Sequence, residues 1–181
     1  MSPILHEAGS VEFGINGLGI LNDAIDCKVV HELNGSYELE MTYPASGIHA
    51  QLITDRSIIK AKPDPLAAPQ PFRVYRILKK MRNLAIYARH LTYDLIGIPA
   101  SPFTASYAVQ AMERLQTHAV AACPFVFSTD KSTTGMMMQA TPKPIWNILG
   151  GSEGSLLDVY GGEYEFDGFR VVLRSRLGAD N

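Results

Sequence analysis

The chain has 181 residues, of which 46% are hydrophobic and 19% charged, and its formal net charge is −2. This length fits one medium domain or two small ones, and the balance favours a packed core over disorder. The small negative charge and the absence of a long basic run argue against a nucleic-acid-binding protein. The chain begins without a basic segment followed by an apolar stretch, and no apolar run reaches about 18 residues, so we expect neither a signal peptide nor a membrane segment.

The first clear element is a β-hairpin around Asn34 and Gly35, with apolar residues at odd positions on both sides of the turn. A two-residue Asn34-Gly35 turn would pair odd with even positions and mix the two faces. A three-residue loop, 33–35, instead pairs Val29 with Leu39 and keeps the apolar residues together. This register predicts Gly35 in the left-handed bulge position.

The rest of the first half also predicts strands. A short strand is expected over 57–61, and the four prolines in 62–71 predict an exposed loop. A second hairpin follows, 72–80 with 83–95, in which one face carries Leu84, Ile86, Ala88 and His90. Prolines and small residues at 96–103 mark a change in composition, so we place a domain boundary at about residue 98.

The second half mixes helices with strands. Helical spacing of Ala108, Met112, Leu115 and Ala119 predicts a helix over 104–119, with Thr104 or Ser106 as the N-cap. A short strand is expected over 124–130. A second helix is predicted over 141–150 with Thr141 as N-cap, Pro142 in its first position and Gly150 as its end, and a helical turn follows over 152–162.

The last expected element is a hairpin over 162–173. Asp167 and Gly168 form its predicted two-residue turn, which places Phe166 opposite Phe169. Glu165 then faces Arg170 on the other side of the hairpin, as an ion pair that helps to fix the register.

The titratable residues show no catalytic or metal-binding constellation. The five histidines lack the spacing of a metal site, and His90 shares an apolar strand face, which favours a buried, hydrogen-bonded imidazole over a catalytic one. Cys27 and Cys123 are too far apart for a CxxC pair, and neither lies in a nucleophile-like context. A single disulfide between them is an alternative to two reduced thiols. The sequence therefore predicts no catalytic residue and no metal ligand.

No cofactor is predicted either. The glycine-rich segment 14–20 does not have dinucleotide-loop spacing, and 150–155 lacks the lysine that closes a phosphate loop. The carboxylates within 153–167 are expected to be solvated, with a weak surface cation site as the alternative. Trp146 is expected in the core, with a carbohydrate platform as the alternative.

Four segments taken in order, ELNGSYELEMTYP, FRVYRI, IYARHLTYDL and PIWNILGGSEGSLLDVYGGEYEFDGFRVVL, resemble phage minor structural proteins. This is the tail-tip family called prophage tail endopeptidase or tail-associated lysin, which is related in fold to the baseplate hub of contractile phages. The resemblance covers most of residues 25–181. It makes the following residues structural motif residues: Asn34, Gly35, Tyr43, Pro44, His90, Tyr93, Asp94, Trp146, Gly151, Gly154, Asp158, Gly162, Glu163 and Asp167.

The resemblance implies a hub that forms a trimeric ring, closes the distal end of the tail tube and contacts distal tail proteins. Its first domain is implied to be a β-barrel related to tail-tube proteins, and a second α+β domain follows. Lytic or receptor-binding parts lie C-terminal to such a hub, so the resemblance does not imply an enzymatic activity for these residues. It implies a location in the virion tail tip, after synthesis in the host cytoplasm.

The sequence thus predicts an α+β chain: an N-terminal antiparallel β-barrel over 1–98 and a smaller α+β domain over 99–181. The predicted function is structural, as the N-terminal fragment of a phage tail-tip hub. Two alternatives stay open, a peptidoglycan-degrading tail enzyme and a carbohydrate-binding module that uses Trp146.

Overall fold

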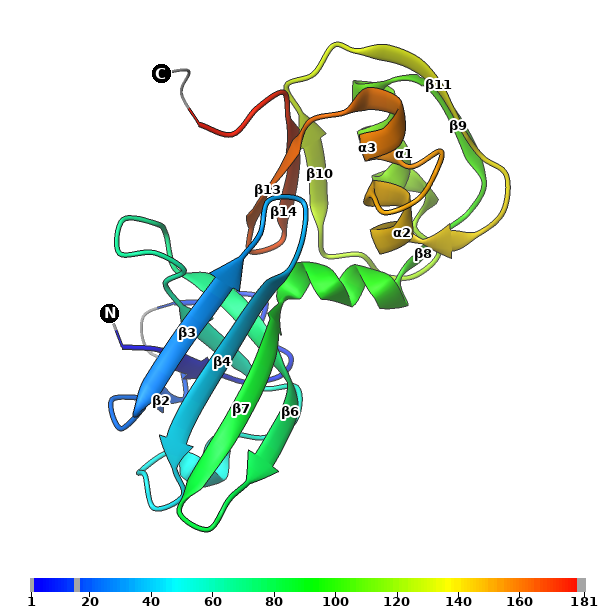
Figure 1. The fold of residues 1–181 in the computed structure, drawn as a ribbon. Coiled ribbons are helices and arrows are strands. Elements are labelled where there is room, and N and C mark those ends of the chain that lie inside the picture. Colours follow the sequence, from blue (N-terminus) through cyan, green and yellow to red (C-terminus); the bar gives the residue numbers. More distant parts are fainter. Residues whose placement is uncertain (1, 15–16, 179–181) are drawn as a thin grey trace. The chain divides into compact units, whose positions relative to one another are not determined.

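The computed structural model describes residues 2–14 and 17–178. The chain is α+β with strands predominating, and it forms two compact units, Met1–Leu91 and Thr92–Asn181 (Figure 1). The division falls after Leu91, the first residue of the 3₁₀ turn η2 (Leu91–Gly97), whereas the change in composition had placed the boundary after this turn. Among the described residues, no helix has the length and apolar character needed to cross a membrane.

The first unit is built on one seven-stranded sheet in which all neighbouring strands are antiparallel. In space the strands follow the order β2-β1-β5-β6-β7-β4-β3. Their bounds in chain order are β1 (Ile4–His6), β2 (Gly19–Ile20), β3 (Asp26–His31), β4 (Tyr37–Pro44), β5 (Ile58–Ala61), β6 (Gln70–Lys79) and β7 (Asn83–His90), with the 3₁₀ turn η1 (Ala50–Leu52) between β4 and β5.

Period-two alternation explains the core of this unit. Every second side chain of β4 and of β7 is buried, and the buried set comes from one face of the sheet. That set includes Leu39, Tyr43, Ile86 and His90, each 0–1% exposed, and Phe72 of β6 is 0% exposed as well. The predicted grouping of Leu84, Ile86, Ala88 and His90 on one face is confirmed.

The β3–β4 hairpin has the predicted register. Val29 lies opposite Leu39, and the Glu32 amide donates to the Ser36 carbonyl at 2.8 Å, which closes a three-residue loop. The expected left-handed Gly35 is wrong, because Asn34 carries the positive φ of 52°. Asparagine tolerates this conformation, and Gly35 is required for space instead, since an added Cβ would lie 2.9 Å from Glu32 Cβ.

The sheet curls into an open half-barrel (Figure 1). In the described part of the chain, no hydrogen-bonded ladder joins its first strand, β2, to its last, β3. The expected loop over 62–71 ends earlier than predicted, because β6 begins at Gln70 and includes Pro71. A bulge between Val74 and Arg76 shifts the register of β6 against β7.

The second unit combines small sheets with short helices. Its elements are β8 (Pro99–Ala100), β9 (Phe103–Tyr107), α1 (Ala108–His118), β10 (Val126–Thr129), β11 (Thr134–Gln139), β12 (Lys143–Pro144), α2 (Ile145–Leu149), α3 (Leu156–Tyr160), β13 (Glu163–Asp167) and β14 (Arg170–Arg174). β14 pairs with β13 antiparallel and with β10 parallel, while β9–β11 and β8–β12 are separate two-stranded antiparallel sheets.

The first helix begins later than the sequence predicted. Ala108, Met112 and Leu115 are buried as expected, but residues 103–107 form β9, so neither Thr104 nor Ser106 is the N-cap. Pairing with β11 decides this, because the extended β9 buries Phe103 and Ala105. The position before the helix is Tyr107, whose side chain makes no capping hydrogen bond.

The second predicted helix is also shorter. It starts at Ile145 after Pro144, and Thr141 and Pro142 precede β12, so both predicted positions are wrong. The predicted end at Gly150 is confirmed. The expected helical turn over 152–162 is present as α3, whose N-cap is Ser155.

The turn of the β13–β14 hairpin lies one residue later than predicted, so each residue of β13 pairs with a residue of β14 two positions further along the chain. Asp167 pairs with Arg170, so Gly168 and Phe169 form the turn and Phe166 lies opposite Val171. Gly168 has φ 56° and Phe169 does not have a positive φ, which is typical of a type II′ turn with glycine in the first central position. A shift of two residues leaves every side chain on the same face, so alternation alone does not separate the two registers.

Candidate functional site

His90 lies in a column of stacked rings in the first unit. Its ring stacks on Tyr37 with a centroid distance of 4.7 Å, and Tyr37 stacks on His31 at 4.0 Å. Phe72 packs edge-on against both His90 and Tyr37. Cross-strand pairing of β3 with β4, in the register that also pairs Val29 with Leu39, positions His31 opposite Tyr37.

Burial suppresses the acid–base chemistry of His90. The ring is 0% exposed, and desolvation together with the nearby His31 lowers the pKa of His90 to about 3. Nε2 lies 3.3 Å from Gln70 Oε1, and since an amide oxygen only accepts, Nε2 carries the proton of a neutral imidazole. A neutral ring that is stacked and hydrogen-bonded supports packing, whereas a general base needs a pKa near the working pH.

Tyr43 and Pro44 belong to the end of β4. The Tyr43 ring is fully buried, and its hydroxyl donates to Asp23 Oδ2 at 3.3 Å while it accepts from the His49 amide at 3.4 Å. Pro44 is the last residue of the strand, opposite Asn83. These contacts tie the β4–η1 loop to the sheet, which is a structural role.

Tyr93 and Trp146 meet in the second unit. Their rings stack at 4.6 Å with an interplanar angle of 28°, and both side chains are half-buried. Asp94 is the next residue of η2 and is also half-buried. Trp146 therefore uses one face of its indole within the protein, at the start of α2.

Gly151, Gly154 and Asp158 shape the start of α3. Both glycines have positive φ, 85° and 74°. Asp158 Oδ2 accepts from the Gly154 amide at 2.8 Å, and Ser155 Oγ accepts from the Asp158 amide at 3.4 Å. This reciprocal arrangement resembles a capping box and satisfies two backbone donors at the helix end.

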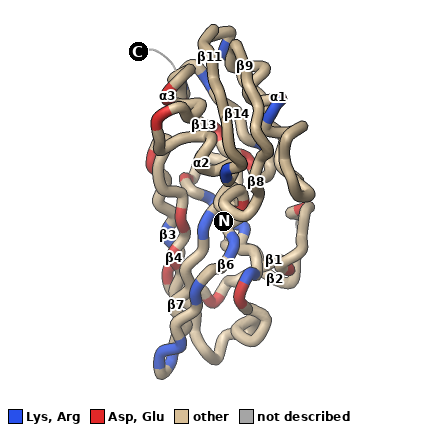
Figure 2. Tube along the Cα trace, turned by 90° about the vertical axis from the view of Figure 1, so that its right-hand side faces the viewer, with Lys and Arg blue, Asp and Glu red and all other residues tan. Residues whose placement is uncertain are grey.

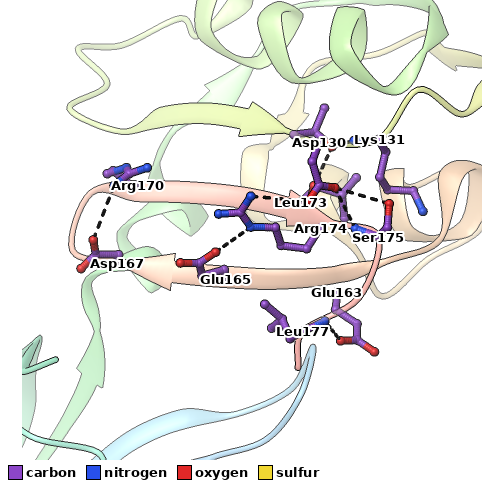
Figure 3. Close-up of polar contacts among 11 residues, drawn as sticks. Asp130, Lys131, Glu163, Glu165, Asp167, Arg170, Leu173, Arg174, Ser175 and Leu177 are labelled. Atoms are coloured by element: carbon purple, nitrogen blue, oxygen red, sulfur yellow. Dashed lines mark hydrogen bonds and ion pairs between the residues drawn. The ribbon is translucent and has the colours of Figure 1, made fainter. Parts of the chain in front are cut away.

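Glu163 and Asp167 are the first and last residues of β13 in the β13–β14 hairpin (Figure 3), and Gly162 directly precedes that strand. Gly162 has φ 109°, and an added Cβ would lie 2.5 Å from the Arg174 carbonyl, so only glycine fits. Glu163 accepts from the Leu177 amide, and Asp167 lies 3.8 Å from Arg170.

Arg174 connects this hairpin to the loop after β10. Its Nε donates to Glu165 Oε2 at 2.7 Å, and Nη1 lies 3.4 Å from Asp130 Oδ2 (Figure 3). The hydrogen bond to Glu165 raises the pKa of Arg174. Asp130 also accepts from the Ser175 amide at 2.9 Å. The carboxylates are thus used to hold the chain that leaves β14, in place of the predicted Glu165–Arg170 pair.

The outer face of β6 and β7 carries a group that the sequence analysis missed. Arg89 lies over the Tyr75 ring at 4.3 Å and forms an ion pair with Glu38 at 3.0 Å, and Arg76 lies over Tyr87 at 5.7 Å. On β7, Tyr87 and Arg89 alternate with buried residues, but on β6 Tyr75 and Arg76 are consecutive and both exposed, because the bulge between Val74 and Arg76 places Arg76 opposite Tyr87.

The described residues contain no group of three or more histidine, cysteine or acidic side chains arranged to hold a metal ion. A hollow of about 430 Å³ in the first unit is lined by His6 and the loop around Gly14 and Gly17. Residues 15 and 16 of the glycine-rich segment 14–20 lie outside the described residues.

No protein-family model matches the chain, and no curated protein matches it. Its fold is similar to the crystal structure of prophage tail protein gp18 from Listeria monocytogenes EGD-e, with a TM-score of 0.71 and 15% sequence identity. The similarity covers 96% of this chain and 50% of that protein, so the chain spans about half the length of its structural neighbour.

Proposed function

We propose that this chain is a structural component of a phage or prophage tail. The observation that carries the proposal is the similarity of 96% of the chain, across both units, to a prophage tail protein. At 15% sequence identity the similarity is one of fold, and the function of the chain has to be inferred separately from its fold. A structural function is supported by the motif residues, because their side chains and backbone groups make packing, helix-capping and strand-pairing contacts.

The proposal extends to the position of the chain in the tail. It forms the N-terminal part of a tail-tip hub, where it closes the distal end of the tail tube and carries lytic or receptor-binding parts. Its partners are two further copies in a trimeric ring and the adjoining distal tail and tube proteins. The enzymatic steps of infection belong to other parts of the tail.

The open ends of the sheet support ring assembly. β3 is a regular six-residue strand whose described residues pair only with β4, and even its inward-facing Cys27 and Val29 are half-exposed. Ile25 and Val30 beside this edge are 61% and 38% exposed. Unpaired strands of this kind are a liability for a free monomer and are covered by partners or closed into barrels. A ring of copies closes the half-barrel by continuing the sheet from one copy to the next.

Labelling of phage particles tests the proposal directly. A lysogen that expresses the tagged protein is induced, and purified particles are labelled with gold against the tag and viewed by electron microscopy. We expect label at the distal end of the tail. Label on the capsid, or particles that contain none of the protein, would contradict the proposal.

Light scattering tests the ring separately. We expect the purified protein to have three times its monomer mass of 19.8 kDa. The double variant Ile25→Lys/Val30→Lys places charges beside the β3 edge and should yield monomers. The matched control is Val11→Lys, because Val11 is 65% exposed, at least as much as Ile25 and Val30, but lies outside the strands of the sheet.

A further inference from the structure

The turn between β6 and β7 concentrates positive charge around an exposed apolar side chain. Lys79, Lys80 and Arg82 are all exposed, and none of them forms an ion pair with a described residue. Met81, between them, is 97% exposed. Figure 2 shows the basic residues at this end of β7. Scattered exposed apolar residues are common, but a nearly fully exposed methionine next to three basic residues that form no ion pair within the described part of the chain is a specific combination.

A second exposed apolar residue lies on the neighbouring loop. The Ala45 amide donates to the Arg82 carbonyl at 2.8 Å, which ties the start of the β4–η1 loop to this turn. Ile48 in that loop is 83% exposed. The two loops lie at the same end of the sheet, at the bottom of Figure 1. We call Ile48 and residues 79–82 the basic tip.

We infer that the basic tip docks on the surface of an anionic lipid bilayer. Met81 and Ile48 enter the boundary between headgroups and acyl chains, while Lys79, Lys80 and Arg82 bind the lipid phosphates. Long basic side chains suit this position because their stems are apolar and their charged ends stay in the headgroup layer. Apolar insertion and attraction to anionic lipid then act together, as in interfacial membrane binding.

The same observations fit other macromolecules less well. Two of the three tip cations are lysines, a residue type that is depleted at protein interfaces, although methionine and arginine are enriched there. A nucleic acid is held through many phosphate contacts, whereas the tip supplies three cations and two apolar side chains that contribute nothing to phosphate binding. The net charge of −2 gives the chain no wider basic field to add to them.

The inference goes beyond the proposed function and does not depend on it. A single tip has few contacts and binds weakly. Several copies that present their tips to one membrane would bind more tightly, because every contact after the first is intramolecular. A failure to bind membranes therefore leaves the role in the tail intact, and vesicle binding by the purified chain is measurable without any phage particle.

Vesicle sedimentation tests the inference. The purified chain is mixed with vesicles of phosphatidylcholine alone or of equal parts phosphatidylcholine and phosphatidylglycerol, at low and at physiological salt. We expect binding to the anionic vesicles that weakens with salt. The triple variant Lys79→Glu/Lys80→Glu/Arg82→Glu should weaken binding at least about tenfold, and Met81→Glu by several-fold, while Met81→Leu retains it.

Leu66→Glu and Met138→Glu are the matched controls, because these side chains are 97% and 71% exposed at other sites. Both should bind like the unchanged protein, and circular dichroism confirms that each variant is folded. Equal binding to uncharged vesicles, or anionic binding that Met81→Glu and the triple variant leave unchanged, would overturn the inference. Binding to poly-glutamate or to a DNA duplex without binding to vesicles would overturn it in favour of a protein or nucleic-acid partner.

Discussion

The two units of the chain are stabilised in different ways. The first is one continuous antiparallel sheet in which a period of two places almost every large side chain. The second consists of short elements packed on a buried apolar core and also joined by individual side-chain hydrogen bonds, such as Tyr164 to the Leu149 carbonyl and Thr129 to the Leu173 carbonyl. A regular ladder therefore spreads stability over many equivalent contacts, whereas the hydrogen bonds between short elements are individual contacts that a single substitution removes.

Phe72→Ala should have the largest effect. Phe72 is 0% exposed and packs edge-on against Tyr37 and His90, so truncation leaves a cavity that costs about 3–5 kcal/mol of unfolding free energy. The single tryptophan, Trp146, lies in the second unit. Urea unfolding followed by circular dichroism should therefore shift, while tryptophan fluorescence shifts little. Equal shifts of both signals would show that the two units unfold together.

Acid should destabilise the first unit next most strongly. His90 has a pKa of about 3 in the folded protein and near 6.5 in the unfolded chain. Between these two values the unfolded chain binds one proton more than the folded protein, so the free energy of unfolding decreases as the pH is lowered. From pH 7.5 to 4.5 we expect a loss of about 3 kcal/mol from this residue. Burial also lowers the pKa of His6 and His31, which adds in the same direction. The contribution of His90 is the part of the pH dependence, measured by urea unfolding, that His90→Gln removes; an unchanged dependence would exclude it.

Tyr164→Phe tests the polar contacts of the second unit. The buried Tyr164 hydroxyl donates to the Leu149 carbonyl at 2.8 Å, and its removal leaves that acceptor without this donor. We expect a loss of about 1–3 kcal/mol, seen as an earlier tryptophan fluorescence transition. Tyr107→Phe is the control, because Tyr107 is 47% exposed and should tolerate the change. A neutral Tyr164→Phe would mean that packing, and not this hydrogen bond, holds α2 to β13.

Glu38→Gln should have the smallest effect. It weakens the ion pair with Arg89 on the outer face of the sheet, where both side chains are part-exposed, at 34% and 42%. Such pairs contribute about 0.2–1 kcal/mol, and we expect the loss, measured by urea unfolding, to disappear in high salt. Glu40→Gln on the same strand is the control. A loss that salt does not reduce would point to the packing of Arg89 on Tyr75 as the stabilising contact.

The difference between the regular sheet of the first unit and the short elements of the second also determines which features could be predicted from the sequence. In the first unit, the alternation of apolar and polar residues was sufficient to predict which strand face is buried and that Val29 pairs with Leu39. A register shifted by one residue would have exposed all of the apolar side chains of the strand. It was not sufficient for the backbone of the turn, where Asn34 and not Gly35 takes the left-handed conformation. The pairing of Arg76 with Tyr87 depends on a bulge in β6, which no local pattern shows.

In the second unit the sequence predicted the kinds of element better than their limits. Residues 103–107 alternate apolar with polar side chains, which is a strand pattern that the helical spacing after Ala108 had masked, whereas residues 143–144 are extended only because β8 pairs with them. The turn at Gly168 could be placed in two registers with identical faces, and the choice between them came from turn geometry. Of the candidate residues, His90 was correctly predicted to be buried and hydrogen-bonded.

The order of strands also governs how the first sheet is made. β3 and β4 are neighbours in sequence and can pair as soon as they are synthesised, but the other side of β4 pairs with β7, after β5 and β6 have intervened. Such a distant pairing carries a larger loop-closure cost and folds slowly. On the ribosome, the early hairpin thus waits with its apolar face uncovered until Asn83–His90 emerges. The rate of translation across this interval sets how long a nascent chain is open to aggregation or to a chaperone.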